Sequence, residues 1–194
     1  MSAPNNLVFM TDLTETSISS EELFEGVLLH AHRDTVRLPD GRTAKREWLD
    51  HPGAVAVVPL FANGDTMLIR QFRFPAHRTF VEVPAGKFDH DNEPSEAVGR
   101  RELKEETGLW AETLTPLGTF FPCIGYSNEV IHVYLAEDLT QGEQELTDDE
   151  FAEPVRLPFE EAVAQAMDGS LADMKTITAL TRAHYAIQQR GAKI

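Results

Sequence analysis

Three glutamates on one short stretch constrain this chain more than any other feature of its sequence. Residues 94–107 predict a helix, because a proline suits its first turn and a glycine, Gly108, suits its C-terminal cap. Glu102, Glu105 and Glu106 are spaced i, i+3 and i+4 and therefore share one face of that helix. Like charges at this spacing repel each other by roughly 0.2–0.5 kcal/mol per pair. A helix with such a stripe gives up stability, so we expect the stripe to have a function.

Two interpretations of the acidic stripe are open on composition alone. The stripe could be a solvated helix end whose charge is balanced by Arg100, Arg101 and Lys104. It could also bind Mg²⁺, a hard cation that prefers oxygen ligands and typically takes one or two carboxylates plus substrate phosphates and water. Gly86, in the preceding loop, lets the backbone approach a ligand closely, and Arg101 could pair with Glu105 at i+4. These two features favour the metal site.

The rest of the chain predicts strands around this helix. Turn residues separate runs of apolar and β-branched residues, which is typical of short strands. We expect strands at 23–37, 43–49, 53–61, 66–74, 79–83, 113–121, 130–136 and 154–157, and helices at 158–167 and 174–189. Many strands with one embedded helix and two terminal helices predict an α/β fold with a mixed β-sheet sandwiched between helices. The region 20–50 predicts a hairpin, which is marginal alone and must pack on something.

The charge of the chain narrows the classes of function. The sequence has 194 residues with 17 Lys+Arg against 32 Asp+Glu, a formal net charge of −15 at pH 7. A nucleic-acid binder needs a basic face to neutralise phosphates, so we expect no nucleic-acid partner. A small anionic ligand stays open, because carboxylates repel phosphate only until a divalent cation fills the site. The charge therefore predicts metal dependence.

The expected location follows from three absences in the sequence. No apolar run approaches the ~20 residues of a membrane span, so we expect no membrane association. The first residues carry neither a basic start nor a long apolar stretch, and no secretory signal is visible. Cys123 is the single cysteine, which excludes an internal disulfide. We expect a cytoplasmic protein.

The segment GKFDHDNEPSEAVGRRELKEETGL, residues 86–109, resembles the Nudix box, G-x5-E-x7-R-E-U-x-E-E-x-G-U with U aliphatic. Every position from Glu93 to Leu109 matches in register, with one extra residue between Gly86 and Glu93. The stretches IRQFRFP, FVEVPAGK, GYSNEVIHVYLA and ADMKTITAL resemble the ADP-ribose pyrophosphatase branch of the Nudix superfamily, and the similarity covers roughly residues 22–182.

This resemblance implies a Nudix fold, a chain divided into two regions, and assembly into a homodimer. Residues 1–50 would form an N-terminal antiparallel strand region that serves dimerisation and contacts substrate, and residues 51–194 would form the catalytic domain. The implied activity is Mg²⁺-dependent hydrolysis of nucleoside diphosphate sugars, with Mn²⁺ as a substitute, and ADP-ribose would yield AMP and ribose 5-phosphate. Two alternatives stay open. One is a preference for GDP-mannose, UDP-glucose or ADP-glucose, and the other is a non-hydrolytic ADP-ribose-sensing module.

The resemblance also implies residue roles. The metal ligands would be the Ala85 carbonyl with Glu102, Glu105 and Glu106, the catalytic residues Glu105, Glu129 and Glu150, and the substrate-binding residues Arg46, Arg73, Glu82 and Glu129. Glu150, in the acidic loop Asp148-Asp149-Glu150, is the preferred general base, with Glu129 as the alternative. Ile124 replaces a proline common in the branch, and Val27 replaces an aromatic residue that stacks the base in some members. These departures leave the ranking of substrates open.

Overall fold

The structure of this protein is a computed structural model that describes residues 12–90, 92–147 and 150–191. The described residues form two compact units. One contains the chain up to His51 together with Cys123–Asn128, and the other contains Pro52–Pro122 and the chain from Glu129 onward. Each unit is described by itself.

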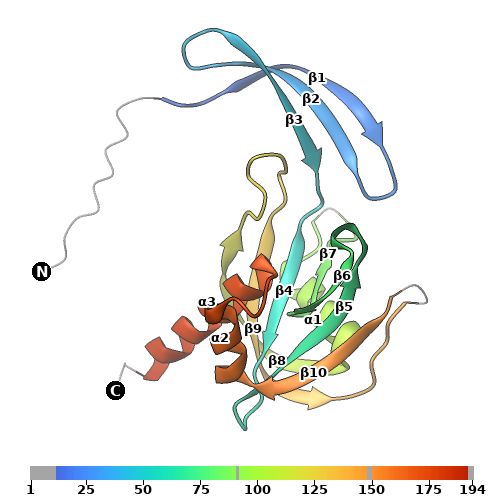
Figure 1. Cartoon of the computed structure of the whole chain (residues 1–194), viewed down its shortest axis with the longest axis vertical. Coiled ribbons are helices and arrows are strands. Elements are labelled where there is room, and N and C mark those ends of the chain that lie inside the picture. Colours follow the sequence, from blue (N-terminus) through green and yellow to red (C-terminus); the bar gives the residue numbers. More distant parts are fainter. Residues whose placement is uncertain (1–11, 91, 148–149, 192–194) are drawn as a thin grey trace, which may run out of the picture. The chain divides into compact units, whose positions relative to one another are not determined.

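The N-terminal unit is a three-stranded antiparallel sheet (Figure 1). Its strands are β1 (Thr16–Glu25), β2 (His30–Arg37) and β3 (Thr43–Asp50), in the order β1-β2-β3. The prediction of a single strand over 23–37 is wrong, because the chain reverses at Gly26, whose N–H donates a hydrogen bond to the Leu29 carbonyl at 2.8 Å. The sheet therefore has one strand more than the predicted hairpin.

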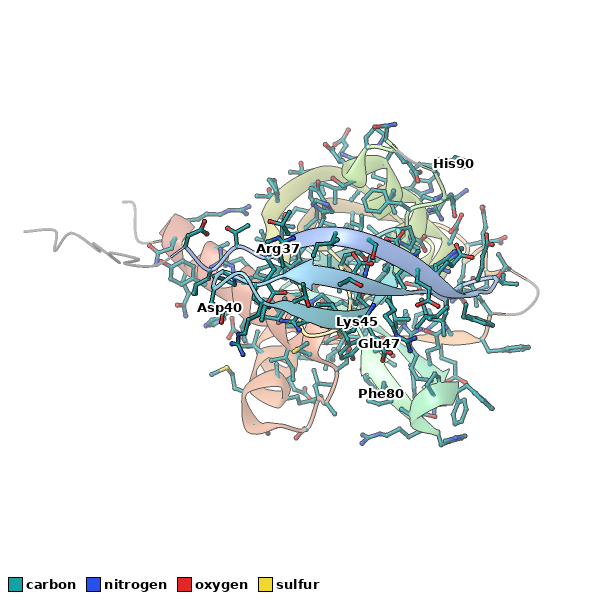
Figure 2. The ribbon with its side chains drawn as sticks, turned by 90° about the horizontal axis from the view of Figure 1, so that it is seen from above. Arg37, Asp40, Lys45, Glu47, Phe80 and His90 are labelled. Atoms are coloured by element: carbon teal, nitrogen blue, oxygen red, sulfur yellow. The ribbon has the colours of Figure 1, made fainter. Side chains whose placement is uncertain are left out.

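This sheet buries little of its own apolar surface. Leu23, Phe24 and Val27 are exposed, and Val36 is the residue of the sheet that is buried. Figure 2 looks onto the three strands, with Arg37 and Asp40 at the end where β2 turns into β3. Small sheets of this kind are marginally stable unless a hydrophobic face packs against another element. A role in dimerisation stays a prediction.

The second unit contains two sheets whose strands are mostly antiparallel. One sheet has the order β7-β4-β9-β8 and the other the order β10-β5-β6. β4 runs parallel to β9, which makes the first sheet mixed. The strands are β4 (Ala54–Pro59), β5 (Asp65–Arg73), β6 (Arg78–Glu82), β7 (Ala85–Lys87), β8 (Leu109–Phe120), β9 (Ile131–Gln141) and β10 (Ala152–Pro158).

Helices cover both faces of the mixed sheet, as the alternation along β4 shows. Val55 and Val57 pack in one cluster with Leu103 of α1, whereas Ala56 and Val58 pack in another with residues of α2 and α3. Successive strand side chains point to opposite faces, so the two clusters lie on opposite sides of the sheet. The helices are α1 (Ser95–Thr107), α2 (Phe159–Asp168) and α3 (Met174–Gly191) (Figure 1). The predicted mixed sheet sandwiched between helices is confirmed.

None of the helices in the described part of the chain is long and apolar enough to cross a membrane.

Candidate active site

The acidic stripe lies on α1, and the predicted helix is confirmed. Pro94 precedes its first turn, and Gly108 caps its last with a φ of 71° and an N–H that donates to the Lys104 carbonyl at 2.7 Å. Val98 and Leu103 are fully buried and fix the helix against the sheet. This anchoring holds the acidic stripe in place beside β7.

Glu106 is the most deeply buried carboxylate of the stripe. Glu106 is only 6% exposed, and its Oε2 accepts a hydrogen bond from the Ala85 N–H at 2.8 Å. Burial raises the pKa of Glu106 to about 8, although the Ala85 N–H opposes the rise. The negative charge of Glu102 adds to it. Such a carboxylate is costly to ionise unless a cation neutralises it.

Glu102 packs directly on the backbone of Gly86. A Cβ added to Gly86 would lie 1.8 Å from Cδ of Glu102 and 2.0 and 2.1 Å from its two carboxylate oxygens. Burial raises the pKa of Glu102 to about 7, against the opposing charge of Arg101. The absence of a side chain at Gly86 is therefore what gives the Glu102 carboxylate its place.

Arg101 links the acidic residues around this site. Its Nη1 lies 2.7 Å from Glu102 Oε1 and 3.2 Å from Glu105 Oε2, so the predicted pairing with Glu105 is confirmed. Its Nη2 donates to the Lys87 carbonyl at 3.1 Å and ties the helix to the end of β7. Arg101 orients Glu102 and Glu105, because one nitrogen contacts both carboxylates.

A second charged group adjoins the carboxylates at the end of β6. Arg73 donates from Nε and Nη2 to the two oxygens of Glu82, both at 2.8 Å, and Glu82 is 2% exposed. Lys175, at the start of α3, pairs with the same carboxylate and lies 2.9 Å from Asp173. Burial opposes ionisation of Glu82, yet the hydrogen bonds from Arg73 and the charge of Lys175 outweigh it and lower its pKa. Arg73 also interacts electrostatically with Glu106, which connects the two groups.

Lys175 and Asp173 were missed in the sequence analysis. They lie in the stretch ADMKTITAL, which supported the family resemblance but received no role. The available signal was an Asp-x-Lys-Thr group at the start of a predicted helix. Nothing local indicates that its partner is 93 residues earlier in the chain.

Three further predicted residues are placed as follows. Glu150 precedes β10, and its charge contributes to the raised pKa values of Glu102 and Glu106, so the structure brings it near both. Its neighbours Asp148 and Asp149 lie outside the described residues. Glu129 is partly buried two residues before β9, and Arg46, in the N-terminal unit, donates from Nε to Glu15 at 2.9 Å. The reaction roles of all three stay predictions.

The donor set of α1 fits a magnesium ion. Glu106 is buried and the Glu102 side chain is partly buried, and burial raises the pKa of both carboxyl groups. Among the described residues, no three His, Cys, Asp or Glu side chains converge as a ready cage. Mg²⁺ suits such a site, because it usually binds through one or two carboxylates and completes its shell with water and substrate phosphates.

Comparisons with known proteins agree with this geometry. Residues 50–179 match the NUDIX domain family, and residues 15–49 match the nucleoside diphosphate sugar hydrolase N-terminal domain. The chain is 39% identical to an ADP-ribose pyrophosphatase of Bacillus subtilis (strain 168) over 88% of its own length and 93% of that protein. It is 36% identical to a methanol dehydrogenase activator of Bacillus methanolicus over 86% and 90%. A crystal structure of an ADP compounds hydrolase superposes with a TM-score of 0.81 at 21% identity, covering 93% of this chain and 98% of that one, which shows the fold.

Proposed function

This chain belongs to the Nudix family of hydrolases, and from that premise we propose that it cleaves the pyrophosphate bond of nucleoside diphosphate sugars. ADP-ribose is the preferred substrate of this proposal, and its products are AMP and ribose 5-phosphate. The observation that carries the proposal is the pair of carboxylates on α1. Glu106 is buried and interacts electrostatically with Arg73, and Glu102 is partly buried and packs on Gly86. The name of the Bacillus subtilis relative supports the choice of substrate.

Two carboxylates of α1 hold the metal in this proposal. Glu102 and Glu106 bind Mg²⁺, with Mn²⁺ as a substitute, and the Ala85 carbonyl is a further ligand. When bound, the metal supplies the positive charge that the pyrophosphate oxygens need before a nucleophile can approach them. Glu105 is a ligand or positions the attacking water, and Arg101 keeps its carboxylate oriented.

The remaining roles belong to groups around the stripe. Arg73 binds a phosphate, since a planar guanidinium matches phosphate oxygens well. Glu150 accepts the proton of the attacking water, because it lies near both metal-binding carboxylates. Glu129 contacts substrate and is the alternative base. Arg46 contacts the substrate of the partner subunit in a homodimer joined through the N-terminal strands.

The test is phosphate release from ADP-ribose, coupled to a phosphatase that acts on the products, with and without Mg²⁺. We expect turnover that requires the metal, and a panel with GDP-mannose, UDP-glucose and ADP-glucose then ranks the substrates. A sensing module, the second candidate, would bind ADP-ribose in calorimetry and release no phosphate. That result would overturn the hydrolytic proposal.

The assignment of the base has its own test. Glu150→Gln keeps the shape of the side chain and removes its ability to accept a proton at neutral pH. We expect turnover to fall by roughly 10²–10⁴-fold, the usual contribution of a general base, with little change in substrate affinity. Glu153→Gln, three residues away on β10, is the matched control, because Glu153 pairs with Arg70 on the exposed surface. A change confined to affinity would make Glu150 a binding residue.

A further inference from the structure

We propose that Lys175 is a positioning residue that neutralises Glu82 and thereby leaves the charge of Arg73 available for the substrate pyrophosphate. The inference rests on the proposed function and adds a residue to which neither the motif nor the comparisons give a role. It starts from four charged side chains at the junction of β5, β6 and α3: Arg73, Glu82, Lys175 and Asp173.

The two cations meet at one buried carboxylate. Glu82 is 2% exposed and receives Arg73 through two hydrogen bonds at 2.8 Å, while Lys175 contacts the same carboxylate from α3. Two cations and two anions sum to zero, so the group as a whole is neutral. A buried charged group of this kind adds little to the free energy of unfolding, because the cost of removing the charges from water offsets their mutual attraction. A role in the reaction is the better explanation of its presence beside the acidic stripe.

The geometry of Arg73 shows what Lys175 changes. Nε and Nη2 of Arg73 are directed at Glu82, and within the described part of the chain no acceptor is hydrogen-bonded to Nη1. Arg73 also interacts electrostatically with Glu106, the deepest carboxylate of the stripe. The Arg73 side chain therefore pairs with Glu82 and is within electrostatic range of Glu106, one of the proposed metal ligands. With Lys175 present, Glu82 is already compensated and the charge of Arg73 can serve a phosphate oxygen.

The position of Lys175 is fixed by the start of α3. Asp173 accepts a hydrogen bond from the Thr176 N–H at 3.0 Å, as an N-cap residue does. The Thr176 hydroxyl accepts one from the N–H of Val83 at 2.9 Å, directly after Glu82. Thr176 is fully buried. The helix start is thus hydrogen-bonded to the strand end that carries Glu82, and the Lys175 ammonium is held at its carboxylate.

Substitutions that change the net charge of these four side chains test the proposal. Lys175→Met leaves the group at −1 beside the acidic stripe, and we expect the KM for ADP-ribose with saturating Mg²⁺ to rise roughly 10- to 30-fold, with a smaller effect on kcat. Lys175→Met combined with Asp173→Asn returns the sum to zero and retains a capping side chain. We expect this double variant to recover most of the lost affinity. Lys175→Arg keeps the charge and should change KM by less than about threefold.

Two controls separate positioning from folding. Arg156→Met also removes a cation and leaves an acid, Asp65, without that partner, but at the opposite end of β5 from Arg73. It should leave KM unchanged. Thermal unfolding of each variant reports any loss of structure, and a recovery of KM without a matching recovery of melting temperature supports the positioning role.

The outcomes are distinct. If Lys175→Met leaves KM unchanged, or if the double variant is as impaired as the single one, charge compensation by Lys175 is refuted. Calorimetric binding of inorganic pyrophosphate with Mg²⁺ repeats the comparison without turnover. If the wild type binds pyrophosphate but hydrolyses no nucleoside diphosphate sugar, the proposed function fails while the ranking of the variants still decides the role of Lys175.

Discussion

Gly86→Ala is the change that most directly tests the arrangement of the site. Gly86 lies in β7 without a positive φ, so the backbone itself accepts alanine. The added Cβ would lie 1.8 Å from Cδ of Glu102, far inside any van der Waals contact, and the carboxylate must move. Because that carboxylate is the far end of a flexible side chain, it can swing away at the cost of about 0.5–1.5 kcal/mol for a strained rotamer.

The expected effects on stability and on activity therefore differ. The displaced Glu102 carboxylate gains water, which offsets part of the rotamer cost, since burial is what raises its pKa to about 7. We expect the free energy of unfolding to change by less than about 1 kcal/mol. Misplacement of a reacting group by about 1 Å can cost roughly 10²-fold in rate, which corresponds to about 2.7 kcal/mol in the barrier.

The assay compares kcat/KM for ADP-ribose with urea unfolding for the same proteins. Gly191→Ala is the matched control, because an added Cβ there meets nothing within 4 Å, and both quantities should stay near wild type. If Gly86 acts through Glu102, then Gly86→Ala combined with Glu102→Gln should be little worse than either single variant. Near-native activity of Gly86→Ala, or losses that multiply in the double variant, would refute the reasoning.

Three further expectations follow from the same contacts. Glu106→Gln should lose most activity at saturating Mg²⁺ and keep its fold, checked by turnover and circular dichroism; near-native turnover would contradict its assignment as a metal ligand. Glu102 and Glu106 have folded pKa values raised to about 7 and about 8 from 4.5, so their contribution to stability is complete below about pH 4.5 and is lost as pH rises through 7 to 8. Without metal, the free energy of unfolding should fall by several kcal/mol between about pH 4.5 and pH 8, since each unit of pKa shift corresponds to about 1.4 kcal/mol. Mg²⁺ should therefore stabilise the protein more at pH 8 than at pH 5, and equal stabilisation at both pH values would contradict this. Thr176→Val should destabilise the protein by about 1–3 kcal/mol in urea unfolding, because the Val83 N–H loses its acceptor. Thr181→Val is the control, because the Thr181 hydroxyl donates only to carbonyls of its own helix.

Local patterns predicted α1 and its surroundings well. The cap residues and the i, i+3, i+4 spacing are properties of one helix, so the helix and the Arg101–Glu105 contact could both be derived without the fold. The split of 23–37 into two strands could not, because β-branched and aliphatic residues continue through the turn at Gly26. The alternation of a strand has the same period on both sides of a tight turn, so the sequence pattern does not mark where the first strand ends.

The pairing of Lys175 with Glu82 could not be predicted for a different reason. A hydrogen bond across 93 residues depends on the packing of α3 against the sheet, which no local pattern contains. The resemblance to the Nudix family transferred roles to the box and to Arg73 and Glu82, yet it did not say how the charge of Glu82 is compensated. The structure shows which cations compensate Glu82, and it thereby separates the acidic residues of the site into two groups. Arg73 and Lys175 lower the pKa of Glu82, whereas burial raises the pKa of Glu102 and Glu106, so the two carboxylates proposed as metal ligands both lie on α1.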